Sequence, residues 1–384
     1  MNRMVKRVGF IINTRKNGNV SCRIMKIKKA LEKTYKNINI DVIYNYEDDS
    51  ISKLKKLLST TIRRYDVIHI FEPSWPSTLF LLFFKIMHIK IVYLSGDLHF
   101  STGDLSGSKS FNYYYMKFVE RFHYFFADSI IVGSLGLKDF LVNVWKIPEE
   151  GVKRILVFTI SCHDQLSYYE QSFKRKSAQD YSTEFVIAYS ASLRLMTFNG
   201  IKVSRGWEIP SIVKKLLEDG FTQIKADVLG DGPGLKYLMS QSHKLGVSDK
   251  ISFRGALSTN DYLSALSNSD LCFVESLNHL SYRVMDPTKI SDYLTAKKPF
   301  IVGRSLETDQ WVDYQLVVEP QSIISFCDME IENYIDEIVA KIEKFISDEM
   351  FRERCYASID KIISSSPTWE DVAMDIHGIY ERFD

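Results

Sequence analysis

Short apolar runs alternate with amphipathic stretches along most of the chain, and this alternation constrains the fold more than any other feature. Residues 7–13 (RVGFIIN), 66–71 (DVIHIF), 89–94 (IKIVYL) and 129–133 (SIIVG) have the length of strands and are dominated by apolar side chains. A strand that is apolar on both faces is typical of a parallel sheet covered by helices on both sides. The sequence therefore predicts an α/β fold that begins with a Rossmann-like domain over residues 1–165.

The same alternation starts again after a polar stretch without apolar periodicity, in which residues 166–182 are interpreted as a linker. A second domain of the same kind is expected over residues 183–365. Two domains also agree with a length of 384 residues, which is too long for one ordinary core. Its strands are expected at residues 184–191, 225–230, 250–255, 270–276 and 299–303.

Composition excludes several classes of protein. Lys and Arg number 49 and Asp and Glu 48, whereas a dedicated nucleic-acid binder carries a basic excess. The five cysteines are scattered and form no CxxC pair, which argues against a disulfide framework or a zinc site and favours a reduced, cytoplasmic chain. The most apolar stretch, residues 78–94, is interrupted by Lys85, His88 and Lys90 before it reaches the ~20 residues of a membrane span. We expect no cofactor and no metal.

Two groups of residues in the second domain stand at the expected carboxyl ends of strands, the edge at which open α/β sheets bind ligands. The turn 228–234 (VLGDGPG) has glycines that let the backbone approach a ligand, although a tight turn without a ligand uses the same residues. Arg194 and Arg205 follow the first strand of this domain. Two guanidinium groups suit a diphosphate, and the alternative is a pair of solvated loop arginines.

The helix predicted within residues 286–294 (DPTKISDYL) carries a cation and an acid in an unusual arrangement. Lys289 stands near the helix N-terminus, which itself attracts phosphate. Asp292 lies one turn further in, beside core-facing residues, where a carboxylate can accept both hydroxyls of a ribose. The alternative is a favourable i, i+3 charge pair between the two side chains. Because this helix start lies at the same edge as the arginines, the sequence predicts a nucleotide-diphosphate pocket.

The corresponding edge of the first domain has loops rich in Gly, Ser and carboxylates, which would face the pocket across a cleft. Asp97 and His99 are its best-placed polar residues. His69 lies within a strand and is interpreted as a core histidine with a satisfied side chain. The acidic residues 47–49 precede a predicted helix at 51–64, so N-capping and the helix dipole explain them better than a metal. No spacing of His or Cys residues supports a metal site.

Taken together, these motifs resemble a known family. The chain is similar to GT-B glycosyltransferases, most of all to glycosyltransferase family 4. The matching segments are residues 127–141 (ADSIIVGSLGLKDFL), 205–257 (RGW, the Gly-rich turn and ISFRGAL), 287–302 (PTKISDYLTAKKPFIV) and 366–380 (SPTWEDVAMDIHGIY). The resemblance implies two Rossmann-like domains whose parallel sheets face a central cleft. It also implies a closing helix, residues 366–384, that packs back on the first domain.

The resemblance places the sugar-nucleotide donor in the second domain. Arg194 and Arg205 match the basic pair on the diphosphate, and Asp292 matches the acid that binds the ribose. Asp97 or His99 matches the polar group beside the reacting carbon, and these two are the catalytic candidates. The implied donor-binding residues are Arg194, Arg205, Gly230, Asp231, Gly232, Gly255, Thr288, Lys289 and Asp292.

The activity implied is that of a retaining, metal-independent glycosyltransferase, of hexosyltransferase type, in cell-surface polysaccharide synthesis. Its partners would be a nucleotide diphosphate sugar and a saccharide or lipid-linked acceptor. The aromatic residues Phe118, Phe122, Tyr124, Phe125 and Phe126 fit peripheral contact with the inner face of the membrane, but core packing is the favoured explanation.

Two other functions remain open. A sugar-nucleotide epimerase of the same architecture would need acid and base side chains in the cleft and no acceptor. A non-catalytic GT-B scaffold that binds a partner transferase is the other option. It is motivated by Val284, which stands where the family pattern E-x7-E has its first glutamate; the neighbouring acids are Glu275 and Asp286.

Overall fold

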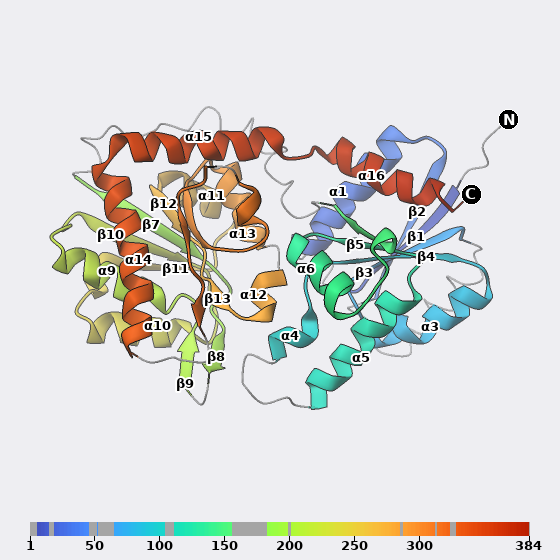
Figure 1. Cartoon of the computed structure of the whole chain (residues 1–384), viewed down its shortest axis with the longest axis horizontal. Coiled ribbons are helices and arrows are strands. Elements are labelled where there is room, and N and C mark those ends of the chain that lie inside the picture. The colour runs from blue at the N-terminus through green and yellow to red at the C-terminus, as the bar shows by residue number, and fades with distance from the viewer. Residues whose placement is uncertain are drawn as a thin grey trace.

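The computed structural model of the chain contains two six-stranded parallel sheets, each flanked by helices (Figure 1). The expected α/β fold is confirmed. The expected helix 51–64, the acidic residues 47–49 and the linker 166–182 lie outside the described residues, apart from Ser52. The structure describes residues 6–14, 19–45, 52, 65–103, 111–155, 183–198, 201–284, 287–311, 313–322 and 328–383.

The first sheet has the strand order β2-β1-β3-β4-β5-β6, and every neighbouring pair is parallel. Val8 of β1 pairs with Ile40 on one side and with Val67 on the other. Strands β3 and β5 are buried at every position, as expected for strands covered on both faces. The strands are β1 (Lys6–Ile12), β2 (Ile38–Tyr44), β3 (Val67–Phe71), β4 (Lys90–Ser95), β5 (Ser129–Val132) and β6 (Val152–Arg154).

Helices cover both faces of this sheet. One face packs against α1 (Asn19–Thr34) and α16 (Trp369–Glu381), and the other against α3 (Trp75–Ile86) and α5 (Phe111–Phe126). Two short helices, α4 (His99–Gly103) and α6 (Leu135–Asp139), follow β4 and β5.

A capping box fixes the residue at which helix α16 begins. The hydroxyl of Thr368 accepts a hydrogen bond from the Asp371 N–H at 3.1 Å, and the Asp371 carboxylate accepts one from the Thr368 N–H at 2.8 Å. The helix also gives one ring nitrogen of His69 a partner, because Nδ1 lies 2.6 Å from the Tyr380 hydroxyl; the other nitrogen, Nε2, is buried without a hydrogen-bond partner among the described residues, so the side chain is only half satisfied. Burial lowers the pKa of His69 to about 3, and its role as a core histidine is confirmed.

The second sheet has the order β11-β10-β7-β12-β14-β15, again with parallel neighbours. Its strands are β7 (Phe185–Ser190), β10 (Ile224–Leu229), β11 (Ile251–Gly255), β12 (Leu271–Phe273), β14 (Phe300–Gly303) and β15 (Val317–Val318). Short strands β13 (Leu277–Asn278) and β16 (Gln321–Ser322) pair separately. The helices are α9 (Glu208–Glu218), α10 (Leu235–Lys244), α11 (Thr259–Asn268), α12 (Leu280–Val284), α13 (Thr288–Thr295), α14 (Asp328–Ser347) and α15 (Glu349–Ser365). No helix among the described residues is both long enough and apolar enough to cross a membrane.

Several elements are not predicted by the sequence, among them β6, β15, α15 and a hairpin after β7. The stretch after β7 was interpreted as a loop, but it contains an antiparallel hairpin of β8 (Leu195–Phe198) and β9 (Ile201–Ser204). Each strand has only four residues, too few for a clear apolar period. The hairpin matters because it positions Arg205, which directly follows β9. The backbone N–H of Arg205 donates a hydrogen bond to the carbonyl oxygen of Arg194 at 3.0 Å.

Candidate active site

A cavity of about 780 Å³ lies between the two domains at the carboxyl ends of their strands. The first domain contributes Arg23 and Lys26 of α1 as well as Asp97 after β4. The volume of the cavity is within the range of about 300–1,000 Å³ that is common for ligand pockets. The predicted site residues that line this cavity are Asp97, Arg205, Gly230, Thr288, Lys289 and Asp292.

Two of the predicted cations share one buried carboxylate. Glu275, which follows β12, accepts hydrogen bonds from Lys289 Nζ at 2.5 Å and from Arg205 Nε at 2.6 Å. The Glu275 side chain is 2% exposed, compared with 24% for Arg205 and 11% for Lys289. Two cations on one carboxylate leave a net positive charge at the cavity floor. Such a charge inside a cleft attracts an anion.

The pKa values within this cluster follow from burial and from the shared carboxylate. Burial opposes ionisation of Glu275, but the two cations outweigh it and lower its pKa to about 2. Burial lowers the pKa of Lys289 to about 8; Glu275 opposes this change and the Arg205 charge adds to it. Burial also works against the Arg205 charge, yet Glu275 raises the pKa of Arg205. At neutral pH all three groups therefore carry their charges for most of the time.

Asp292 projects into the same cavity from the second turn of α13. Its Oδ2 accepts a hydrogen bond from the Tyr262 hydroxyl at 3.1 Å, whereas Lys289 pairs with Glu275. Lys289 and Asp292 therefore do not form the charge pair that was the alternative explanation of their spacing. Burial raises the pKa of Asp292 to about 6, and the charge of Arg23 and the hydrogen bond from Tyr262 limit the rise. Helix α13 has Pro287 as its N-cap, not as its first helical residue, and Asp286 lies outside the described residues.

Arg23 was missed by the sequence analysis, although it links the two domains at this site. From α1 its Nη2 donates a hydrogen bond to Ser291 Oγ of α13 at 2.9 Å, and the residue is 7% exposed. It stands beside the apolar position Ile24, so local periodicity gives no sign that it faces a cleft. The available signal was a basic residue near the start of the first helix after β1.

The Gly-rich turn is explained by backbone packing. Gly230 has a φ of +134°, and a Cβ atom there would lie 1.9 Å from the carbonyl oxygen of Ala191. The Gly230 N–H donates to the Gly255 carbonyl oxygen at 2.9 Å, so it is already engaged within the protein. The Asp231 carboxylate accepts from the Gly232 N–H at 2.7 Å. The tight-turn alternative accounts for these glycines, and Gly230 lines the cavity through its backbone.

Four predicted donor-site residues do not line the cavity: Arg194, Asp231, Gly232 and Gly255. The Arg194 side chain is exposed, which agrees with the alternative of a solvated loop arginine. In the described part of the chain, the residue that stands beside Arg205 on the cavity floor is Lys289.

Of the two catalytic candidates in the first domain, Asp97 lines the cavity and His99 does not, and the two differ in ionisation. His99 Nε2 lies 2.5 Å from Glu72 Oε2. Burial disfavours the charged imidazole, but Glu72 raises the pKa of His99 to about 9. The walls of the cleft raise the pKa of Asp97 to about 6 even though its side chain is open to solvent; His99 and Arg205 oppose this rise. At neutral pH, Asp97 can therefore accept a proton whereas His99 is already protonated.

Solved structures share this two-domain arrangement. The apo form of the lipopolysaccharide outer core galactosyltransferase WaaB matches with a TM-score of 0.58 at 13% identity, over 92% of this chain and 99% of that one. UDP-GlcNAc 2-epimerase from Neisseria meningitidis bound to UDP-GlcNAc matches with a TM-score of 0.58 at 11% identity, over 98% of this chain and 100% of that one. An E. coli structure described as trehalose-6-phosphate bound with UDP-2-fluoro glucose matches with a TM-score of 0.61 at 10% identity, over 98% of this chain and 99% of that one. The chain has the GT-B fold. No family model and no curated protein matches the sequence.

The GT-B fold narrows the function without deciding it. It is shared by glycosyltransferases and by UDP-GlcNAc 2-epimerases, and both kinds are similar to this chain to a comparable degree. At such low identity the likeness shows the fold alone, and the membership of family 4 stays a prediction. The argument for one activity has to come from the residues of the cleft.

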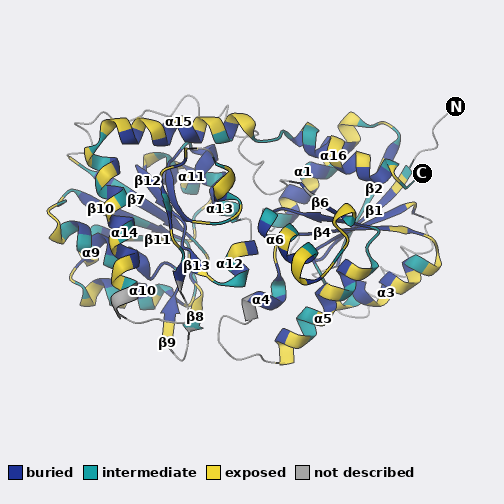
Figure 2. Cartoon of the chain, viewed as in Figure 1, coloured by how far each residue is buried: buried dark blue, intermediate teal, exposed yellow. Residues whose placement is uncertain are grey.

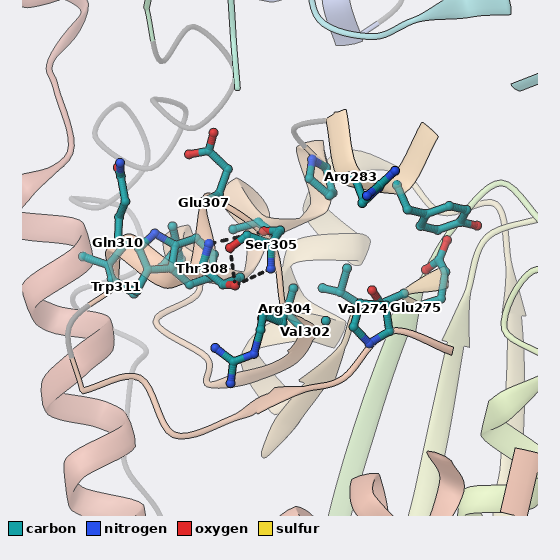
Figure 3. Close-up of a pocket in the computed structure, with 18 of the residues that line it drawn as sticks. Val274, Glu275, Arg283, Val302, Arg304, Ser305, Glu307, Thr308, Gln310 and Trp311 are labelled. Atoms are coloured by element: carbon teal, nitrogen blue, oxygen red, sulfur yellow. Dashed lines mark hydrogen bonds between the residues drawn. The ribbon is translucent and has the colours of Figure 1, made fainter. Parts of the chain in front are cut away.

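A second cavity of this GT-B chain, of about 310 Å³, lies against another face of α13 (Figure 3). Several of its polar groups are engaged within the protein, among them Glu275, which contacts Arg205 and Lys289. The Ser305 N–H donates to Thr308 Oγ1 at 2.8 Å, and the Glu307 carboxylate accepts from the Leu135 N–H of the first domain. The larger cavity is the candidate ligand site, because it is lined by the two cations Arg205 and Lys289; Glu275, the carboxylate that both contact, lines the smaller cavity.

Proposed function

We propose that this chain is a retaining, metal-independent glycosyltransferase of family 4 type. It would move a sugar, of hexose type, from a nucleotide diphosphate sugar to a glycan or lipid-linked acceptor in cell-surface polysaccharide synthesis. The observation that carries the proposal is that the cations Arg205 and Lys289, both held by Glu275 behind them, line one cavity together with Asp292 and Asp97. GT-B structures that hold UDP or UDP sugars support a donor of this class.

In this proposal the donor diphosphate lies at the N-terminus of α13. Arg205 and Lys289 stabilise the negative charge that develops on the diphosphate as the sugar leaves, and the helix dipole adds to this effect. The ribose lies one turn further along the helix, where the Asp292 carboxylate accepts its two hydroxyls. Arg23 completes the site from the first domain and keeps the cleft closed around the donor.

Asp97 acts as the base that takes the proton of the acceptor hydroxyl, which attacks the anomeric carbon from the same face as the departing diphosphate, so that the configuration is retained. It is the only one of the two first-domain candidates that is ionised and able to accept at neutral pH. His99 remains protonated beside Glu72 and places a positive charge near the reacting groups. Because donor and acceptor are held in one cleft, proximity supplies much of the rate.

We expect the pH profile of kcat/KM to be bell-shaped. The acidic limb should lie near pH 6, where Asp97 and Asp292 lose their protons. The basic limb should begin near pH 8, where Lys289 loses its charge, and continue through pH 9, where His99 loses its proton. Initial rates across this range test it, and a rate that does not change through pH 6 would exclude Asp97 as the base. Melting temperatures should be measured in parallel. The raised pKa of His99 stabilises the fold fully below pH 6.5, and this contribution is lost as the pH rises through 9.

Activity is expected to survive removal of divalent metal ions. The cavity floor offers Arg205 and Lys289 as the charges that neutralise the leaving diphosphate, a role that a metal ion fills in other transferases. Turnover should therefore be the same with and without EDTA. Loss of turnover in EDTA that is restored by magnesium or manganese would contradict this prediction.

A sugar-nucleotide epimerase is the second candidate, because acid and base groups gather near Asp97. The Glu120 carboxylate accepts a hydrogen bond from the His99 N–H, and burial raises the pKa of Glu120 to about 8. At neutral pH the Glu120 carboxyl is thus mostly protonated, whereas the Asp97 carboxyl is mostly ionised. An epimerase needs such an acid and such a base to remove a proton from the sugar and to return one. Incubation with the donor alone discriminates: an epimerase changes the configuration of the sugar, whereas a transferase at most hydrolyses it. A non-catalytic scaffold would not bind any nucleotide sugar in a calorimetric titration.

A further inference from the structure

Helices α3 and α5 expose a large set of apolar side chains on the outside of the first domain. The most exposed are Ile86 at 73%, Phe111 at 86% and Phe125 at 73%. Figure 2 shows exposed positions along both helices. We call this set the outer face; its members are Trp75, Leu79, Leu82, Phe83, Ile86, Met87, Phe111, Tyr114, Phe118 and Phe125.

Core packing does not account for the outer face. Each helix has a second apolar side that fills the core: Phe80 and Phe84 of α3, and Tyr113 and Tyr124 of α5, are at most 7% exposed. The expectation that residues 118–126 serve core packing holds for Tyr124 and fails for Phe118 and Phe125. Apolar residues on two sides of a surface helix indicate that the outward side also meets an apolar environment.

The two helices form one continuous surface. They contact each other and cover the same face of the first sheet, opposite α1 and α16 (Figure 1). On α3 the outer face follows helical spacing from Trp75 through Leu79 to Ile86, and on α5 from Phe111 through Tyr114 to Phe118. Side chains at this spacing lie on one side of a helix.

The charges that border the outer face are basic. Arg121 is exposed and Lys117 is half-buried on α5, and His88 and Lys90 follow α3 at exposed positions. Within these two helices, which are both fully described, the single acid is Glu120, and it is buried. The nearest acid in sequence after α5, Asp128, is 2.8 Å from Lys85 and is thereby neutralised. An apolar surface with a basic border is complementary to a negatively charged apolar layer.

We propose that the outer face docks on the surface of a lipid bilayer that contains anionic lipids. Its apolar side chains would enter the boundary between headgroups and acyl chains, while Arg121 would contact anionic headgroups. Trp75 and Tyr114 suit the interface, where amphipathic rings are enriched. A second copy of the chain is a poorer partner, because joining two outer faces brings like charges together.

Docking would also bring the cleft to the bilayer. Helix α4, which begins at the candidate residue His99, packs against α5. A lipid-linked acceptor held in the bilayer would then reach Asp97 from the side of the docking surface. The docking itself does not depend on the proposed reaction and can be tested without any substrate.

Co-sedimentation with vesicles tests the proposal. The protein should bind vesicles of phosphatidylcholine and phosphatidylglycerol at least about tenfold more tightly than vesicles of phosphatidylcholine alone. The triple variant Ile86→Ser, Phe118→Ser, Phe125→Ser should lose at least about tenfold of this affinity. The single variant Arg121→Glu should weaken binding to the anionic vesicles alone. A matched control, Met239→Ser, Met350→Ser, Met374→Ser, removes three exposed apolar side chains elsewhere and should bind like the parent.

Three results would overturn the proposal. The first is absence of vesicle binding by the parent protein at low salt. The second is unchanged vesicle binding by both the triple variant and Arg121→Glu, with melting temperatures that show both to be folded. The third is self-association in analytical ultracentrifugation that the triple variant abolishes, without binding of the parent to vesicles. That outcome would assign the outer face to a second copy of the chain.

Discussion

Asp97→Asn should reduce kcat by about 10²–10⁴-fold, the usual effect of removing a general base. The amide keeps the size of the side chain but cannot accept the proton of the acceptor hydroxyl. The proposed diphosphate-binding residues, Arg205 and Lys289, belong to the second domain, so the affinity for the donor should change little. Turnover with saturating donor and acceptor, together with calorimetry for donor binding, separates the two effects.

The control for this variant is Asp249→Asn, which changes an exposed carboxylate in the second domain, outside the cavity. It should leave both turnover and donor affinity unchanged. The Asp97 variant should also lose the acidic limb in the pH profile of kcat, because at saturating donor the ionisation of Asp292, which acts on donor binding, no longer limits the rate. An Asp97→Asn protein with parental kcat would show that the base lies elsewhere in the cleft.

Glu275→Ala should lower the free energy of unfolding of the ligand-free protein by about 3–5 kcal/mol, the range for breaking a buried ion pair from one side. The variant leaves Arg205 and Lys289 close together without the carboxylate that both contact. A bound nucleoside diphosphate would supply the missing negative charge. The rise in melting temperature on adding the nucleotide should therefore be larger for the variant than for the parent.

A matched control is Glu319→Ala, which removes a carboxylate that accepts a hydrogen bond from Arg304 at 2.6 Å on the surface. The Glu319 side chain is 65% exposed, so its loss should change stability by at most about 1 kcal/mol. Chemical denaturation of the three proteins gives the comparison. Equal stability of the Glu275 variant and the parent would show that the cluster does not hold two buried charges, and the argument for an anion site would fail.

The fold could be predicted because its main signal is local. Apolar runs of strand length that alternate with helices leave few architectures, and nearly every strand of the two sheets was located in this way. The hairpin at residues 195–204 was missed since strands of four residues have no usable period. The Gly-rich turn was seen, but the reason for its glycines, the close approach of residues 191–193, depends on a neighbouring strand that the sequence does not identify.

Only part of the site could be predicted from the sequence, because some of its residues depend on contacts with residues far away in the chain. Lys289 and Asp292 could be predicted because a helix start has a known chemistry at known offsets. The role of Glu275 depends on contacts with Arg205 and Lys289, which are 70 and 14 residues away in the chain. Arg23 acts across the domain boundary, 268 residues from its partner Ser291. Local patterns do not carry such long-range pairings. The partners of Glu275, which the sequence offers only as a neighbouring acid, and the role of Arg23 therefore required the structure.

Calorimetry with ribonucleoside diphosphates and their 2′-deoxy counterparts tests most directly whether this cleft holds a nucleotide donor. At pH 7.5 the Asp292 carboxylate is mostly ionised, because its pKa is about 6. The parent protein should prefer the ribose form of UDP, GDP or ADP. Asp292→Asn should weaken binding of that form by roughly 10-fold or more, in line with about 1.5–3 kcal/mol for a charged hydrogen bond, and bind the deoxy form almost as the parent does. If none of these diphosphates binds, or if the variant keeps the full ribose preference and only its melting temperature falls, the cleft is not the donor site.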